Sequence, residues 1–295
     1  MIGLFDSGFG GLTIYQALKS RFPDIPFVYL GDHGNAPYGN KSSQDIYELT
    51  QFGVESLFRY GCRLVILACN TATAVAARKL QQDWLPGSEW SGHNVVGIIA
   101  PTVEAATQTP WSIKTPQYPQ KNNDDVILLF ATQRTVSTDV YPEEIHKRCP
   151  RVRLLQQDCP HLAGAIEDMA PQHEREALVK SYVDTALKTA FEKWPHHTPH
   201  TAILGCTHYP LVRTLFEVYL PDYTRIFCQP TRVADSLEDY LERHPYYLKN
   251  TLPDALEQQR CRFLTTGKTV SIPKFMQPVI QDNIIFQKLS PESLV

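Results

Sequence analysis

The sequence predicts an α/β protein with a mainly parallel, doubly wound sheet. Short apolar runs alternate with stretches whose apolar residues recur at helical spacing, from residue 2 to about residue 241. Several runs end in glycine, cysteine or hydroxyl residues, and the strands of an open α/β sheet end in this way beside a ligand. The length of 295 residues, with 43% hydrophobic and 20% charged residues, suits one large or two ordinary domains.

The composition argues against several other classes of protein. A net charge of −3 provides no basic surface for nucleic acid. No apolar run approaches the ~20 residues of a membrane span, and the N-terminus lacks the basic region of a secretion signal. The cysteines number seven and include no C-x-x-C pair, which argues against a disulfide framework. We therefore expect a cytoplasmic protein with no membrane or nucleic-acid partner.

The first hundred residues show the clearest alternation. A strand is expected at residues 2–5, then a glycine-rich turn and a helix. A second strand at 27–30 leads into a long loop with Pro37, Tyr38 and Gly39. The helix after this loop precedes the apolar run that ends at Cys69, and a further strand is expected at 95–99.

The pattern is interrupted once and then resumes. Residues 107–125 are rich in proline and polar residues and are expected to form an inserted surface loop. Later strands are expected at 126–130, 152–155, before Cys206 and at 225–228, with helices between them that include Glu167 and Pro210. The tail from about His244 is expected to be loop-rich, with a last strand at 261–264.

Two cysteine segments share one layout. Cys69 and Cys206 each end an apolar run, and each is followed at once by small polar residues and a helix start. The amino end of a helix favours the thiolate form of a cysteine. Asp6, at the end of the first strand, could come near Cys69, and His208 lies two residues beyond Cys206.

Several chemistries could use this pair of thiols. A zinc site at Cys69, Cys206 and His208 lacks the short-range ligand doublets typical of zinc, and a redox pair is more often C-x-x-C. A single nucleophile needs only one cysteine. Two thiols on matching scaffolds could instead remove a proton from one face of a carbon and return one to the other, which is racemisation. From spacing alone these hypotheses stay open.

The histidines at 196, 197 and 200 have metal-ligand spacing, but we interpret their proline-bracketed segment as a solvated loop.

A series of short motifs occurs in a fixed order along the chain. They are IGLFDSG-x-GGLT at 2–13, GD followed by PYG-x-KS within 31–42, ACNTA at 68–72, AT-x-x-T at 131–135, CP at 159–160 with Glu167, and LGCTHYPL at 204–211. In these motifs the chain resembles the glutamate racemases of the cofactor-independent aspartate/glutamate racemase superfamily. Departures include His33-Gly34-Asn35 after the Gly-Asp pair and Pro101-Thr102 where Pro-Gly is common.

The resemblance implies two similar α/β lobes, with mainly parallel sheets flanked by helices and an active site in the cleft between them. Residues 1–98 and 211–295 would form the first lobe, and residues 99–210 the second. It implies an isomerase that interconverts L- and D-glutamate and supplies D-glutamate for peptidoglycan. No pyridoxal phosphate, other cofactor or metal is implied, and we expect a homodimer. The alternatives are an aspartate racemase or another isomerase of the superfamily and, less favoured, a non-catalytic amino-acid-binding protein, which would not need two thiols.

The resemblance also implies roles for individual residues. Cys69 would take the α-proton of D-glutamate with the assistance of Asp6. Cys206 would take that of L-glutamate with the assistance of Glu167 and His208. Substrate would be held at its side-chain carboxylate by Ser7, Pro37, Tyr38 and Gly39, and at its α-carboxylate and amino group by Asn70, Thr71 and Thr207, with Thr132 and Thr135 nearby.

Overall fold

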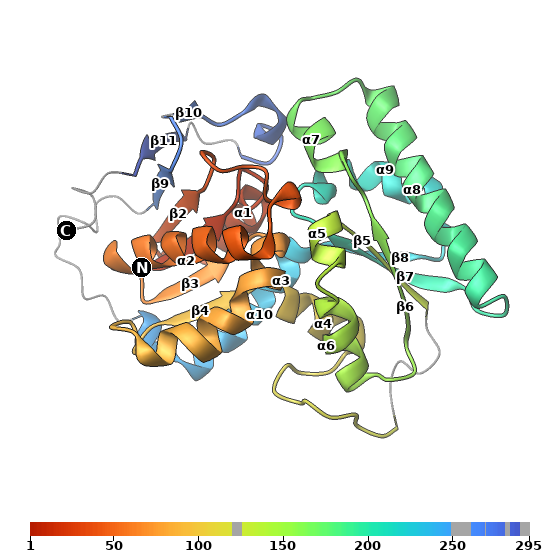
Figure 1. Ribbon diagram of the computed structural model, residues 1–295, viewed down its shortest axis with the longest axis horizontal. Helices are drawn as coiled ribbons and strands as arrows, with labels where there is room; N and C mark the ends of the chain where they lie inside the picture. The colour runs from red at the N-terminus through yellow and green to blue at the C-terminus, as the bar shows by residue number, and fades with distance from the viewer. Residues whose placement is uncertain (120–125, 249–260, 269, 281–283, 290–295) are drawn as a thin grey trace. The chain divides into compact units, whose positions relative to one another are not determined.

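The computed structural model describes residues 1–119, 126–248, 261–268, 270–280 and 284–289 (Figure 1). The chain divides into two compact units, Met1–Ile98 with Val233–Val295 and Ile99–Arg232. Each unit contains a mainly parallel sheet flanked by helices, which confirms the predicted fold class. Within the described residues, no helix is both long enough and apolar enough to cross a membrane.

The second crossing between the units comes later than expected. The sequence placed the return to the first lobe at residue 211, whereas the first unit resumes at Val233. The cause is β8 (Arg225–Phe227), which pairs in parallel with β7 (Pro199–Gly205) and keeps the chain in the second sheet. Helix α10 (Gln229–Arg243) then contains the crossing point.

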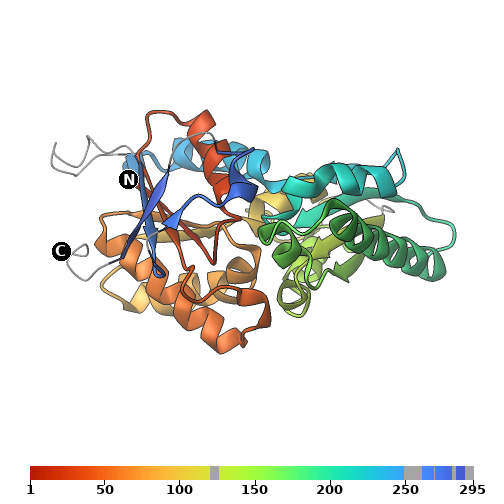
Figure 2. The ribbon, with the colours of Figure 1, turned by 90° about the horizontal axis from the view of Figure 1, so that it is seen from above.

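The sheet of the first unit has the strand order β10-β11-β9-β2-β1-β3-β4. Its strand β1 is buried along its whole length, as a central parallel strand must be when helices cover both faces. Helices α1 and α10 lie on one face and α2 and α3 on the other (Figure 2). The strands and helices are β1 (Ile2–Asp6), α1 (Leu12–Arg21), β2 (Phe27–Gly31), η1 (Tyr38–Asn40), α2 (Ser43–Arg59), β3 (Leu64–Leu67), α3 (Asn70–Lys79), η2 (Leu80–Trp84), η3 (Leu85–Gly87) and β4 (Asn94–Gly97).

The C-terminal tail contains more secondary structure than expected. Beyond η5 (Pro245–Leu248), strand β9 (Cys261–Thr265) pairs with β2, and β11 (Ile285–Lys288) pairs with β9. Strand β10 (Val270–Ser271) and η6 (Lys274–Met276) complete this segment. Phe263 and Phe286 pack against each other with ring centroids 5.5 Å apart, and both contact Tyr29. This aromatic cluster explains why the tail adds to the sheet.

The sheet of the second unit has the order β6-β5-β7-β8, the same plan as β2-β1-β3-β4 in the first. Helices α8 and α9 lie on one side of it and α4 and α6 on the other (Figure 1). Pro210 lies in the 3₁₀ turn η4 (Tyr209–Val212) instead of opening an α-helix as expected, and helix α9 begins only at Arg213. The elements are α4 (Ile99–Thr107), β5 (Val126–Ala131), α5 (Gln133–Val136), α6 (Val140–Arg148), β6 (Arg153–Asp158), α7 (Leu162–Glu167), α8 (Gln172–Lys193), η4 (Tyr209–Val212) and α9 (Arg213–Tyr219).

The first part of the inserted loop is fastened to the second unit. The Trp111 amide donates to Glu104 at 2.6 Å, and the Trp111 carbonyl accepts from Arg148 at 2.9 Å. Arg148 lies over the Trp111 ring, 4.2 Å from its centroid, and pairs with Glu144 at 2.9 Å. The Arg148 side chain is only 1% exposed, so this ion pair is buried.

We expect Arg148→Ala to lower the free energy of unfolding by about 3–5 kcal/mol, because it leaves the Glu144 carboxylate buried without this partner. Lys147→Ala is the matched control. Lys147 pairs with the same carboxylate at 2.7 Å from a side chain that is 41% exposed, and its loss should cost no more than about 1 kcal/mol. Urea unfolding measures the free energy of unfolding of both variants. Equal losses would contradict the assignment of Arg148 as the buried partner of Glu144.

Candidate active site

The register of the parallel strands brings the predicted site residues together within each unit. In the first unit Phe5 pairs with Leu67, and the Ala68 amide donates to the Phe5 carbonyl at 2.7 Å. In the second unit Ala131 pairs with Gly205. Residues that directly follow paired strands therefore share one sheet edge, the edge where open α/β sheets bind ligands.

The Cys69 half-site lies at the carboxyl end of β3. Cys69 is buried and caps helix α3, where its Sγ accepts a hydrogen bond from the Ala72 amide at 3.4 Å. The Ser7 Oγ, from the end of β1, lies 3.3 Å from the same sulfur. The Ala72 amide and the positive end of a ten-residue helix thus favour negative charge on this sulfur. Asn70 and Thr71 are buried in the first turn of α3.

Asp6 is held rigidly in the same half-site. Its carboxylate accepts hydrogen bonds from the Gly11 amide and from the Tyr29 hydroxyl, the latter at 3.1 Å. A Cβ atom at Gly11 would come 2.8 Å from the carboxylate oxygen, so this approach requires glycine. Asp6 is 1% exposed and sits one residue from Ser7. Tyr29 is a site residue that the sequence did not identify.

The loop with Pro37 and Gly39 is anchored through a buried tyrosine. The Tyr38 hydroxyl donates to the Asp32 carboxylate at 2.6 Å. Burial and the Asp32 charge raise the pKa of Tyr38 strongly, and Cys69 and Asp6 add to the shift, which places Tyr38 near both. A hydroxyl has one proton to donate, so a ligand would meet the backbone amides of this loop rather than the Tyr38 proton. A Cβ at Gly39 would meet nothing within 4 Å, which shows open space beside the loop.

The Cys206 half-site contains a three-member relay at the carboxyl end of β7. The buried Cys206 Sγ lies 3.7 Å from His208 Nδ1, and His208 Nε2 lies 2.7 Å from the Glu167 carboxylate. Glu167 ends α7, and the Tyr209 hydroxyl donates to the Cys159 carbonyl at 3.3 Å, which ties the segment before α7 to η4.

The pKa of His208 is raised well above its ordinary value of 6.5. Burial alone would lower this pKa, but hydrogen bonds and negative charge from Cys206 and Glu167 outweigh burial. The imidazolium form is therefore favoured at neutral pH, and it can donate to the sulfur through Nδ1 and to the carboxylate through Nε2.

The predicted threonines of the second unit lie at the same sheet edge. Thr132 follows β5 and caps α5 by accepting from the Thr135 amide at 3.3 Å, and the two hydroxyls are 3.0 Å apart. Thr207 is buried directly after Cys206. The predicted residues are thus grouped in two half-sites, one in each unit. Asp32 is a further member of the first, although the sequence showed it only as part of a motif.

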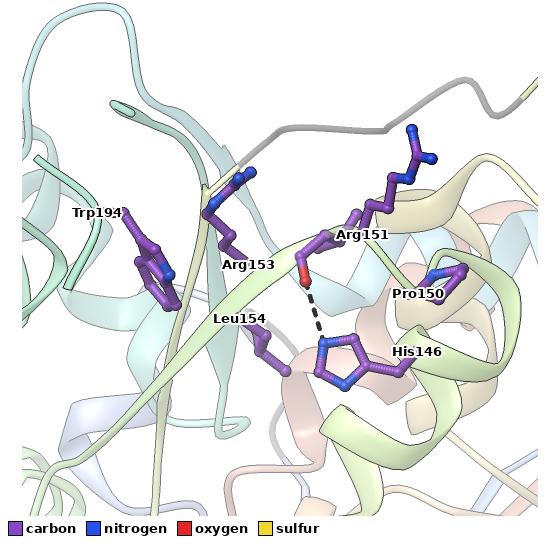
Figure 3. A pocket seen from close by; sticks show the side chains of 7 residues that line it. His146, Pro150, Arg151, Arg153, Leu154 and Trp194 are labelled. Carbon is purple, nitrogen blue, oxygen red and sulfur yellow. Dashed lines mark hydrogen bonds between the residues drawn. The ribbon is translucent and has the colours of Figure 1, made fainter. Parts of the chain in front are cut away.

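Two further kinds of site come into question within the described residues, a metal centre and a surface hollow. No group of three or more His, Cys, Asp or Glu suited to a metal ion occurs in the described part of the chain. A hollow of about 410 Å³ is lined by residues that include His146, Arg153 and Trp194 (Figure 3). It lies where β6 begins, and parallel strands put that end of the sheet opposite the edge with Cys206.

No family model matches this chain. The glutamate racemase of Phenylobacterium zucineum is 45% identical over 271 residues, which cover 90% of this chain and 92% of the relative. That of Jannaschia sp. is 42% identical over 286 residues, with coverage of 97% and 98%.

Solved structures of glutamate racemases share the fold. RacE1 from Bacillus anthracis aligns with a TM-score of 0.76 at 24% identity, over 99% of this chain and 97% of that chain. The Francisella tularensis enzyme, solved in complex with D-glutamate, aligns with a TM-score of 0.75 at 25% identity, over 98% and 95%. Sequence relatives of 42–45% identity over nearly the whole length show that the chain belongs to the glutamate racemase family of isomerases.

Proposed function

We propose that this protein interconverts L- and D-glutamate by two-base proton transfer at the α-carbon. The observation that carries the proposal is the repeated plan of the two units. Each has the same four-strand order, and each places a buried thiol after the third strand of that order. The family assignment supplies the substrate, since the relatives are glutamate racemases.

The proposed reaction uses the thiols in opposite protonation states. With L-glutamate bound, the Cys206 thiolate removes the α-proton, and the Cys69 thiol donates its proton to the opposite face of the same carbon. The electron pair of the broken C–H bond is held at the α-carbon and its carboxylate until the new C–H bond forms. The product is D-glutamate, and the enzyme is left with a Cys206 thiol and a Cys69 thiolate, ready for the reverse reaction.

Fixed donors would stabilise the charge that develops in this reaction. We assign the side-chain carboxylate to Ser7 and to the loop of Pro37, Tyr38 and Gly39, where the amides of Tyr38 and Gly39 can donate. We assign the α-carboxylate and amino group to Asn70, Thr71 and Thr207, with Thr132 and Thr135 beside them. Donors already held in place stabilise a developing carbanion without reorganisation. Asp6 would assist Cys69, and the His208–Glu167 pair would assist Cys206.

The biological role follows from the product. We propose that the D-glutamate is supplied to peptidoglycan synthesis, in the cytoplasm. A homodimer remains our expectation for the assembly. Aspartate racemisation is the alternative activity, since aspartate carries the same two carboxylates and ammonium group on a shorter side chain.

Purified protein should racemise L-glutamate in heavy water without added cofactor. Polarimetry would show loss of optical rotation, and NMR would show deuterium entering at Cα. Exchange of aspartate but not glutamate would establish the alternative activity. Failure to exchange either amino acid would contradict racemisation.

Single replacement of either thiol by serine should reduce racemisation at least about 100-fold, because each removes the acid/base group from one face. Each variant should still exchange the α-proton of one enantiomer, D-glutamate for Cys206→Ser and L-glutamate for Cys69→Ser. Cys228→Ser is the matched control, because Cys228 also follows a strand, β8, but belongs to neither half-site. Normal racemisation by Cys206→Ser would require a one-base mechanism.

NMR titration of the His208 ring should give a pKa above 6.5. Cys206→Ser and Glu167→Gln should each move that pKa down, because each removes negative charge from one side of the ring. A raised folded-state pKa means that the stability contributed by charged His208 is complete below about pH 6.5 and is lost as pH rises through the folded-state pKa. Cys228→Ser should leave the titration unchanged, and a wild-type pKa at or below 6.5 would refute the relay.

A further inference from the structure

The buried carboxylate of Asp32 joins three separate parts of the first unit. Its Oδ2 accepts from the Tyr38 hydroxyl at 2.6 Å, and its Oδ1 accepts from Asn35 Nδ2 at 2.9 Å and from the Thr266 hydroxyl. Its amide donates to the Asp6 carbonyl at 2.8 Å. Asp32 is 2% exposed, so these contacts account for a charge that would otherwise be costly to bury.

Thr266 makes the most distant of these contacts in sequence. It directly follows β9, in the tail, and its Oγ1 both donates to Asp32 and accepts from the Gly34 amide at 3.1 Å. Its neighbour Thr265 is fully buried and lies 2.8 Å from His33 Nδ1. The parallel pairing of β9 with β2, which sets Thr265 opposite Gly31, fixes this corner.

The tail also supports the glycine-rich turn that carries Ser7. The His33 ring stacks on Phe9 with centroids 3.8 Å apart, and Phe286 from β11 packs edge-on to both rings. A Cβ at Gly34 would lie 3.1 Å from the Thr266 carbonyl oxygen, so the tail approaches this loop closely. His33 and Gly34, two of the three residues that depart from the usual family sequence at 33–35, therefore contact the tail.

We propose that Asp32 and Thr266 are positioning residues for substrate, and that the C-terminal segment thereby forms part of the active site. Thr266 holds Asp32 and Asp32 holds the Tyr38 hydroxyl. Tyr38 thereby fixes its own backbone amide and that of Gly39. The inference rests on the proposed function, in which those amides bind the side-chain carboxylate of glutamate. Neither Asp32 nor Thr266 takes part in proton transfer.

Three single variants test this chain of contacts. Thr266→Val removes the hydroxyl at nearly constant shape, whereas Thr266→Ser keeps the hydroxyl and removes the methyl group. Thr50→Val is the matched control, because Thr50 is fully buried and its hydroxyl donates to the Ile46 carbonyl at 2.6 Å in helix α2. The readouts are KM and kcat for glutamate, the melting temperature, and hydrogen exchange of the amides of residues 38–41.

Thr266→Val should raise KM about tenfold, the scale of one hydrogen bond to a charged group, and change kcat by less than about threefold. Exchange of the loop amides should become faster in this variant. Thr266→Ser should behave as wild type, and Thr50→Val should lose stability without a change in KM or loop exchange. Tyr38→Phe combined with Thr266→Val should add little to Tyr38→Phe alone, because the contacts act in series.

An unchanged KM in Thr266→Val, or a Thr266→Ser variant as defective as Thr266→Val, would overturn the proposal. Wild-type protein without racemase activity would contradict the proposed function instead. In that case, hydrogen exchange of the loop amides would by itself test the positioning role of Thr266. Faster exchange only in Thr266→Val supports it, and equal exchange in Thr266→Val and Thr50→Val refutes it.

Discussion

Both half-sites depend on parallel strands that end in register at one edge of a sheet. Pairing of Phe5 with Leu67 sets Asp6 and Ser7 beside Cys69, and pairing of Ala131 with Gly205 sets Thr132 beside Cys206. A slip of one residue in either pair would turn every side chain to the other face and separate these groups. The buried apolar strands that fix the register are therefore as necessary to the site as the residues in it.

The two thiols are built into matching scaffolds but have different partners. The Cys69 sulfur is near a hydroxyl and a backbone amide, whereas the Cys206 sulfur is near a histidine whose other nitrogen meets a carboxylate. The two half-sites are therefore chemically different, although L- and D-glutamate are mirror images. Each partner set can hold a thiolate, through neutral donors in one unit and an imidazolium in the other. In the two-base reaction that we propose, both thiols alternate between the protonated and the thiolate form.

The sequence predicted the parts of the fold that come from local pattern. Alternating apolar runs located most strands of both sheets, and the repeated cysteine layout reflects the shared strand order. Local sequence patterns could not predict the Asp32–Thr266 contact, which joins residues 234 positions apart in the sequence. Nor could they predict the addition of β11 to the sheet. The late boundary at Val233 also depends on tertiary pairing, because β8 is too short to reveal its sheet. A polar residue directly after β9 was the available signal for Thr266, and it matched the strand ends at Cys69 and Cys206.

The isotopic course of the first turnovers in heavy water tests the two-base account most directly. With one acid/base group on each face, L-glutamate should yield D-glutamate that carries deuterium at Cα from the outset. The unreacted L-glutamate should keep protium at early conversion, because the group that removes a proton is not the one that returns it. Mass spectrometry of the separated enantiomers makes the measurement. Early D-glutamate that retains the substrate's own protium would contradict the account, because a single base would then serve both faces.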